Sequence, residues 1–249
     1  MSEETRPINV DLADDNRTSC YEYLIIDRSG SMRPLQDTVI QQVNDYIAKS
    51  KESRKTLNLP TYLSILLFDD MQIQHLNFAP IEEAIPLTHD TYVPRGMTAL
   101  NDAVADAISH LRDELKGREK EVSVVLTVFT DGYENCSVRY PGTNNAELKG
   151  FITEISNSFN WVVNYIGAGK AEVVHDAAAS LGIPCSNTMH YSASTAGVTD
   201  AMTMFSISNE SRKVRLAKSG LQSCTNVGYF SSSDSNPPVD TTASVSNQV

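Results

Sequence analysis

Apolar residues alternate along the chain between short continuous runs, which predict strands, and stripes at helical spacing, which predict helices. The run at 122–130 is almost wholly apolar, as expected of a central strand that is covered on both faces. An Asp-Asp turn separates residues 62–68 from 72–78, so these two runs are expected to pair as an antiparallel hairpin. Strands are predicted at 21–27, 62–68, 72–78, 122–130, 161–167 and 185–189, and helices at 34–53, 99–115, 145–157, 174–181 and 195–218.

The alternation of strands and helices predicts an α/β fold in which a mostly parallel sheet carries helices on both faces. Residues 1–18 are polar and are interpreted as a lead-in, and residues 19–218 as a single domain. The segment 219–249 is rich in Ser and Thr, a composition that favours a tail that is flexible or bound to a partner. In open sheets of this kind ligands bind beyond the carboxyl ends of the strands, at the point where the strand order reverses.

Length indicates how large a core the chain can bury, and net charge indicates which kinds of partner it is expected to bind. The chain has 249 residues, of which 41% are hydrophobic, enough to bury one sizeable core. Its 31 acidic and 20 basic residues give a net charge of −11, which argues against nucleic acid and anionic membranes as partners. The first residues lack the basic and apolar segments of a secretory signal, and no apolar run is long enough to cross a bilayer. A soluble cytoplasmic protein is therefore expected.

Candidate chemistry begins directly after the first predicted strand. The stretch Asp-Arg-Ser-Gly-Ser places the oxygens of Asp27, Ser29 and Ser31 at alternate positions, and Gly30 leaves the loop free to curl around them. Such hard oxygen ligands suit Mg²⁺, Mn²⁺ or Ca²⁺. Taken alone, the same stretch is also an ordinary Ser- and Gly-rich turn.

Two further polar residues, Thr98 and Asp131, can each be interpreted in more than one way. Thr98 precedes a predicted helix, where its hydroxyl could cap the first turn. Asp131 ends the buried run at 122–130 and is followed by a glycine, a common turn signal. Glu134 and Asn135 come next and are interpreted as parts of a solvated loop. None of these signals is specific by itself.

In combination, the three stretches resemble the metal-ion-dependent adhesion site (MIDAS) of von Willebrand factor A domains. Their order, spacing and structural context all match that motif, and the resemblance covers residues 20–215. It is strongest to single-domain bacterial and bacteriophage members of the family. The matching stretches are Asp-Arg-Ser-Gly-Ser-Met at 27–32, Pro-Arg-Gly-Met-Thr-Ala-Leu at 94–100 and Thr-Asp-Gly-Tyr-Glu-Asn at 130–135.

The resemblance implies a Rossmann-like, doubly wound sheet of six strands in the order 3-2-1-4-5-6, with strand 3 antiparallel. It also implies that Ser29 and Ser31 bind a metal directly, that Asp27 and Asp131 bind it mainly through water, and that Thr98 does either. Mg²⁺ is the expected ion, with Mn²⁺ or Ca²⁺ as alternatives. Mg²⁺ is six-coordinate and keeps exchangeable waters, so a Glu or Asp carboxylate of a protein partner could occupy one position. The residues expected to rim the site and contact that partner are Arg28, Met32, Arg33, Met97 and Tyr133.

Three functions are compatible with the sequence. The leading hypothesis is a non-catalytic, metal-dependent module that binds an acidic group of a protein partner. The first alternative is a structural or assembly protein, such as a virion component, in which the metal only stabilises the loops. The second alternative is a metal-dependent hydrolase, against which the absence of an evident nucleophile or general base beside the motif counts.

Overall fold

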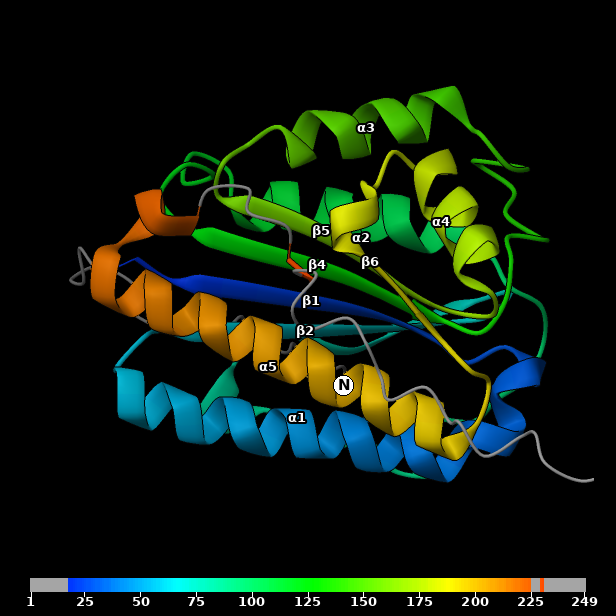
Figure 1. Ribbon diagram of the computed structural model, residues 1–249, viewed down its shortest axis with the longest axis horizontal. Coiled ribbons are helices and arrows are strands. Elements are labelled where there is room, and N and C mark those ends of the chain that lie inside the picture. Colours follow the sequence, from blue (N-terminus) through cyan, green and yellow to red (C-terminus); the bar gives the residue numbers. More distant parts are fainter. Residues whose placement is uncertain (1–17, 225–228, 231–249) are drawn as a thin grey trace, which may run out of the picture.

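The computed structural model describes residues 18–224 and 229–230, which form a sheet with helices on both faces (Figure 1). The sheet has six strands in the order β3-β2-β1-β4-β5-β6. All neighbouring strands are parallel except β2 and β3, which are antiparallel. The predicted fold class, strand order and hairpin are therefore confirmed. The strands are β1 (Cys20–Asp27), β2 (Thr61–Phe68), β3 (Gln72–Pro80), β4 (Ser123–Thr130), β5 (Trp161–Ala168) and β6 (Thr188–Tyr191).

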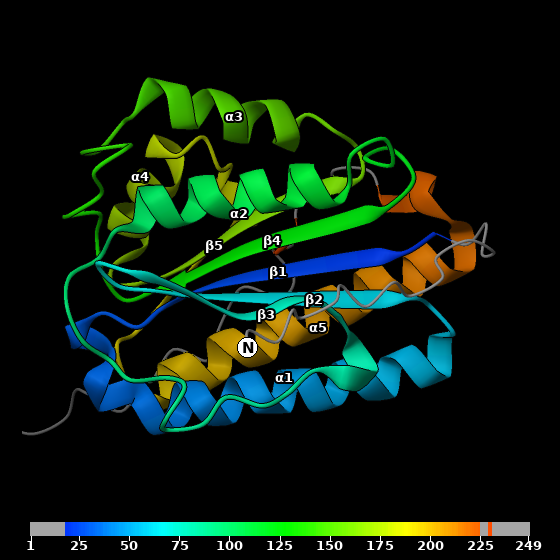
Figure 2. The ribbon, with the colours of Figure 1, turned by 180° about the vertical axis from the view of Figure 1, so that it is seen from behind.

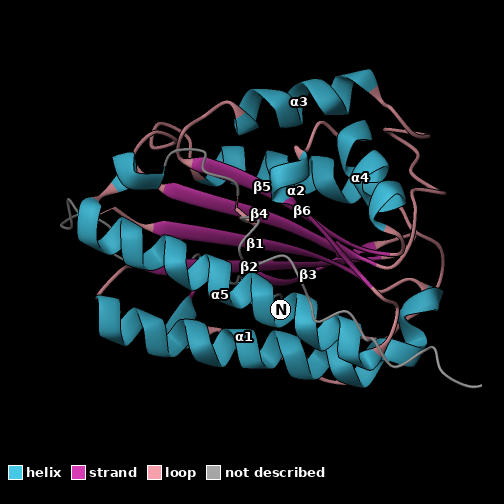
Figure 3. Cartoon of the chain, viewed as in Figure 1, coloured by secondary structure: helices cyan, strands magenta, loops and turns pink. Residues whose placement is uncertain are grey.

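In the described part of the chain, five α-helices cover the sheet, two on one face and three on the other (Figures 1 and 2). Helices α1 and α5 lie side by side on the first face, and α2, α3 and α4 pack on the second (Figure 3). The α-helices are α1 (Gln36–Leu57), α2 (Leu100–Glu114), α3 (Ala146–Ser156), α4 (Ala171–Ser180) and α5 (Thr195–Ser219). Short 3-10 helices occur at η1 (Gly30–Leu35), η2 (Ile81–Glu83), η3 (Cys185–Asn187) and η4 (Leu221–Cys224).

The central strands β1 and β4 are buried along their whole length, as the apolar run at 122–130 predicted. Successive side chains of a strand point to opposite faces. Leu24 and Ile26 of β1 therefore pack with α1 and α5, whereas Tyr23 and Ile25 pack with the opposite helix layer. This double cover fixes the positions of the strand ends, from which the candidate site is built.

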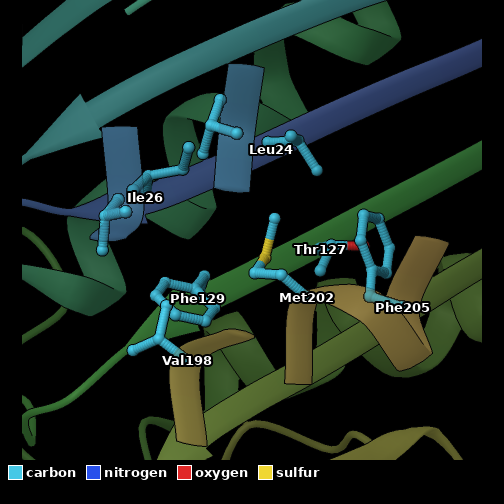
Figure 4. A pocket seen from close by; sticks show the side chains of 9 residues that line it. Leu24, Ile26, Thr127, Phe129, Val198, Met202 and Phe205 are labelled. Carbon is cyan, nitrogen blue, oxygen red and sulfur yellow. The ribbon is translucent and has the colours of Figure 1, made fainter. Parts of the chain in front are cut away.

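A small apolar cavity lies between the sheet and the pair α1 and α5 (Figure 4). Its volume is about 10 Å³, close to the smallest space that holds one water molecule. It is a packing void rather than a ligand site. The residues around it are Leu24, Ile26, Val39, Val43, Thr127, Phe129, Val198, Met202 and Phe205.

Helix α5 is attached to the sheet by a buried ion pair as well as by apolar contacts. Lys213 Nζ lies 2.8 Å from Glu22 Oε1 of β1, and the two side chains are 2% and 1% exposed. The other carboxylate oxygen of Glu22 accepts a hydrogen bond from the hydroxyl of Tyr46 in α1 at 2.7 Å. Asn209 Nδ2 of α5 donates to Glu22 Oε1 at 2.7 Å. One carboxylate thus links β1, α1 and α5.

The predicted terminal segments fall largely outside the described residues. This applies to residues 1–17 of the predicted lead-in and to most of the predicted tail at 219–249. Within the tail, Tyr229 and Phe230 are buried, and their backbone amides donate to Asn187 Oδ1 at 3.3 Å and Ser186 O at 3.1 Å. None of the helices in the described part of the chain is long and apolar enough to span a bilayer.

Candidate metal site

The candidate site lies at the carboxyl ends of β1 and β4, which are neighbours in the sheet. Asp27 is the last residue of β1 and Thr130 the last of β4, so the loops that follow them open side by side. The strand order runs to β2 on one side of β1 and to β4 on the other, which makes this the switch point of the sheet. The sequence predicted a site at this position.

Four of the five predicted ligands form one hydrogen-bonded group. The backbone N–H of Ser29 donates to Asp27 Oδ1 at 2.7 Å, which folds the loop back over the strand end. The hydroxyls of Ser29 and Ser31 lie 3.1 Å apart. Ser31 Oγ donates to Asp131 Oδ1 at 2.7 Å, across the gap between the two loops. Asp27 and Ser29 are buried, Asp131 is half-buried and Ser31 is exposed, so the group opens to solvent on one side.

Thr98, the fifth predicted ligand, approaches the same group from a third loop. A Cβ atom added to Gly132 would lie 3.3 Å from Thr98 Oγ1 and 3.7 Å from Asp27 Oδ2, so both oxygens border the space beside this glycine. The loop of Thr98 is also joined to the first loop, because Gly30 N–H donates to Gly96 O at 3.2 Å. Helix α2 begins after Ala99, not Thr98, and Ala99 has no side chain that could cap it.

The donor set fits a hard divalent cation. It contains two carboxylates and three hydroxyls, with no nitrogen or sulfur ligand. Such an all-oxygen set suits Mg²⁺ better than it suits Zn²⁺ or Cu²⁺. Within residues 18–224 and 229–230, no group of three or more His, Cys, Asp or Glu side chains is placed to hold a metal. A cation at this site would therefore depend on the hydroxyls as much as on the two carboxylates.

The electrostatics of the site also favour a cation. Burial raises the pKa of Asp27 from 3.8 to about 6, although hydrogen bonds from Thr130 and Ser29 oppose the shift, and the nearby Asp131 adds to it. Burial raises the pKa of Asp131 as well. Each carboxylate thus loses hydration that a bound cation would replace. The carboxylate of Asp27 is held in place by Thr130 Oγ1, which donates to its Oδ2 at 2.5 Å.

The predicted rim is only partly exposed. Arg33, Met97 and Tyr133 are exposed, the last two by 54% and 52%. Met32 is fully buried, because the 3-10 helix η1 turns its side chain into the core, and its assignment to the rim was wrong. Arg28 was also assigned wrongly, since its guanidinium is buried and lies 2.9 Å from Asp69 Oδ2.

Several supporting residues were not predicted from the sequence. The buried hydroxyl of Tyr92 donates to Asp27 O at 2.6 Å, and that of Tyr191 donates to Thr130 O at 3.1 Å. These two bonds hold the ends of β1 and β4. Glu134 and Asn135, which we interpreted as parts of a solvated loop, also bond to the segment that carries Thr98 and begins α2, and Asn135 is exposed. Their proximity to Asp131 in the Thr-Asp-Gly stretch was the signal available in the sequence.

In comparisons with family models and with curated protein sequences, nothing matches this chain. Solved structures with a similar fold include the PilB minor pilin from Streptococcus sanguinis, at 13% identity and a TM-score of 0.53, over 83% of this chain and 63% of the pilin. A von Willebrand factor type A protein from Catenulispora acidiphila aligns at 14% identity and a TM-score of 0.48, over 78% of this chain and 43% of its own. Proximal thread matrix protein 1 from the mussel byssus, in a structure with a zinc-occupied MIDAS motif, aligns at 16% identity and a TM-score of 0.48, over 76% of this chain and 45% of its own.

The chain therefore spans less than half the length of the last two proteins and less than two thirds of the pilin. At 13% identity the likeness to the pilin concerns the fold alone. The sheet order, the single antiparallel strand β3 and the flanking helices give this chain the fold of a von Willebrand factor A domain, as the sequence resemblance predicted.

Proposed function

We propose that this domain binds a divalent cation, with Mg²⁺ as the leading choice, and uses it to bind an acidic group of a protein partner. The observation that carries the proposal is the convergence of oxygens from three loops at the switch point. Ser31 bonds across to Asp131, and the oxygens of Thr98 and Asp27 both border Gly132. A turn without a ligand would not require donors from three separate segments to meet.

The residues that would hold the ion are Asp27, Ser29, Ser31, Thr98 and Asp131. By the resemblance, the hydroxyls of Ser29 and Ser31 bind directly, and the carboxylates act mainly through bound water. When bound, the cation would supply positive charge and an exchangeable position that a Glu or Asp side chain can fill. The rest of the domain orients the donors, since Thr130 and the Ser29 amide fix the Asp27 carboxylate.

The proposal is of a binding site rather than a catalytic one. Thr130 and Asp27 bond to each other in the buried floor of the site, which keeps this hydroxyl–carboxylate pair away from solvent. Around the opening, the exposed Met97 and Tyr133 offer apolar area, and Arg33 offers a positive charge. This combination suits contact with a protein segment that carries an acidic side chain.

The test is calorimetric titration of the protein with Mg²⁺, Mn²⁺ and Ca²⁺, repeated in the presence of acetate or a short Glu-containing peptide. Wild type is expected to bind one ion saturably, and the carboxylate ligand to alter that binding. Asp27→Asn, which preserves size, is expected to abolish it. Saturable binding that is equal in both proteins would contradict the proposed site. Metal binding that no carboxylate affects would favour a metal that only stabilises the loops.

A further inference from the structure

The loop after β4 is fastened to the residue that supplies the third hydroxyl. Asn135 bonds to Thr98 twice: its Oδ1 accepts from Thr98 N at 2.8 Å, and its own N–H donates to Thr98 O at 3.1 Å. Both backbone polar groups of Thr98 are therefore held by one residue. That residue lies four positions after Asp131, on the same loop.

Glu134 attaches the same loop to the start of α2. Its Oε2 accepts from the backbone N–H of Asn101 at 2.8 Å. Its Oε1 accepts from the N–H of Ser137 at 2.7 Å, and Ser137 Oγ in turn accepts from the N–H of Asp102 at 3.1 Å. Asn101 and Asp102 are the second and third residues of α2, whose amides have no partner inside the helix.

These amides are the ones that a helix normally pairs with its own N-cap side chain. Here the N-cap is Ala99, which has no polar side chain, and the neighbouring Thr98 precedes it. Glu134 and Ser137 provide the caps from a distant segment. The hydroxyl of Thr98 is consequently not engaged in capping and is left at the edge of the metal site.

The far end of the loop is fastened as well. The carboxylate of Asp102 accepts from the amides of Val138 at 2.9 Å and Tyr140 at 3.0 Å. Asn101 Nδ2 donates to Tyr140 O at 2.8 Å. The loop that follows Asp131 and the start of α2 thus form one hydrogen-bonded unit.

We propose that Glu134 and Asn135 are positioning residues that fix Thr98 relative to Asp131, so that these two donors reach the cation as one rigid pair. The inference rests on the proposed function, because fixing Thr98 relative to Asp131 matters only if these residues bind a cation. It adds that residues outside the ligand set are also needed for cation binding. The cation site depends on a carboxamide and a carboxylate that do not touch the ion.

The test compares Asn135→Ala with Asn145→Ala in the full chain. Asn145 is a matched control, because its Oδ1 also accepts a backbone N–H, that of Leu148 at 3.1 Å, at the start of α3. Loss of a supporting residue outside the ligand set typically lowers metal affinity by about 10–100-fold. We expect a loss of Mn²⁺ affinity in that range for Asn135→Ala and wild-type affinity for Asn145→Ala. Asn135→Asp keeps an acceptor oxygen and should retain affinity.

A second readout needs no metal. Hydrogen exchange of the Thr98 amide in chelator should accelerate in Asn135→Ala and stay slow in Asn145→Ala. Equal Mn²⁺ affinity in wild type and Asn135→Ala, or an equal loss in both alanine variants, would overturn the positioning role. If wild type itself binds no cation, the proposed function fails, and unchanged exchange at Thr98 would separately show that Asn135 does not hold it.

Discussion

The Thr130 hydroxyl donates a 2.5 Å hydrogen bond to the buried carboxylate of Asp27, and this bond joins the ends of the two central strands. The Asp27 carboxylate is fully buried, yet the bonds that it receives come from neutral groups, Thr130 and the amide of Ser29. A buried carboxylate in such surroundings is costly in its charged form. The buried charge therefore lowers the stability of the metal-free protein, and the proposed cation would compensate for it.

Asp27→Asn is predicted to stabilise the metal-free protein while abolishing cation binding. The new amide can still accept from Ser29 N, and its NH₂ can donate to Thr130 Oγ1, which can turn its own proton to Gly132 O at 3.2 Å. The gain corresponds to the shift of the Asp27 pKa from 3.8 to about 6. It amounts to at most about 3 kcal/mol at pH 7. Urea unfolding in chelator measures it, and a destabilised variant would show that the charge is compensated in another way.

The stability of the metal-free protein is predicted to depend on pH through the Asp27 carboxylate. Because the folded pKa of Asp27 is raised, the folded state binds more protons than the unfolded state between pH 3.8 and about 6. The stability contributed by this group is therefore greatest at low pH and falls as pH rises through that window. The difference in unfolding free energy between wild type and Asp27→Asn, measured in chelator from pH 4 to 7.5, isolates the effect. A difference independent of pH would refute it.

Gly132→Ala is predicted to weaken cation binding without unfolding the domain. The added Cβ would lie 3.3 Å from Thr98 Oγ1, within the space that Thr98 and Asp27 border. We expect at least a tenfold loss of Mn²⁺ affinity, or about 1.4 kcal/mol. Gly150→Ala is the control, since nothing lies within 4 Å of its added Cβ in α3 and affinity should be unchanged. Undiminished affinity in Gly132→Ala would place the cation elsewhere.

Lys213→Met is predicted to destabilise the fold by about 3–5 kcal/mol, because it leaves the Glu22 carboxylate buried without its ion-pair partner. The double variant with Glu22→Gln should recover most of that loss. Cation affinity should not change, since Glu22 lies five residues before Asp27 along β1, about 17 Å away. Chemical denaturation and Mn²⁺ titration of the same samples test both statements. A loss below about 1 kcal/mol in the single variant would contradict the first.

The sequence predicted the elements of this fold well, because runs such as 122–130 and the stripes on the helices carry the periodicities of strand and helix. It also indicated which oxygens meet, through three stretches at strand and helix ends. It did not reveal the partners of Glu22, or the tyrosine hydroxyls that hold the strand ends, because those contacts join residues far apart in the chain. Met32 was misplaced because a 3-10 turn, invisible in the local pattern, turns it inward.

The most direct test of the cation site is the anomalous scattering of Mn²⁺ in crystals of the protein grown or soaked with that ion. We expect one strong peak beside Ser29, Ser31 and Thr98, with the Ser29 and Ser31 hydroxyls within about 2.2 Å, as is typical of a hard octahedral ion. Crystals of Asp27→Asn should lack the peak. Its absence from wild-type crystals at saturating Mn²⁺, or a peak bound by other residues, would contradict the central claim.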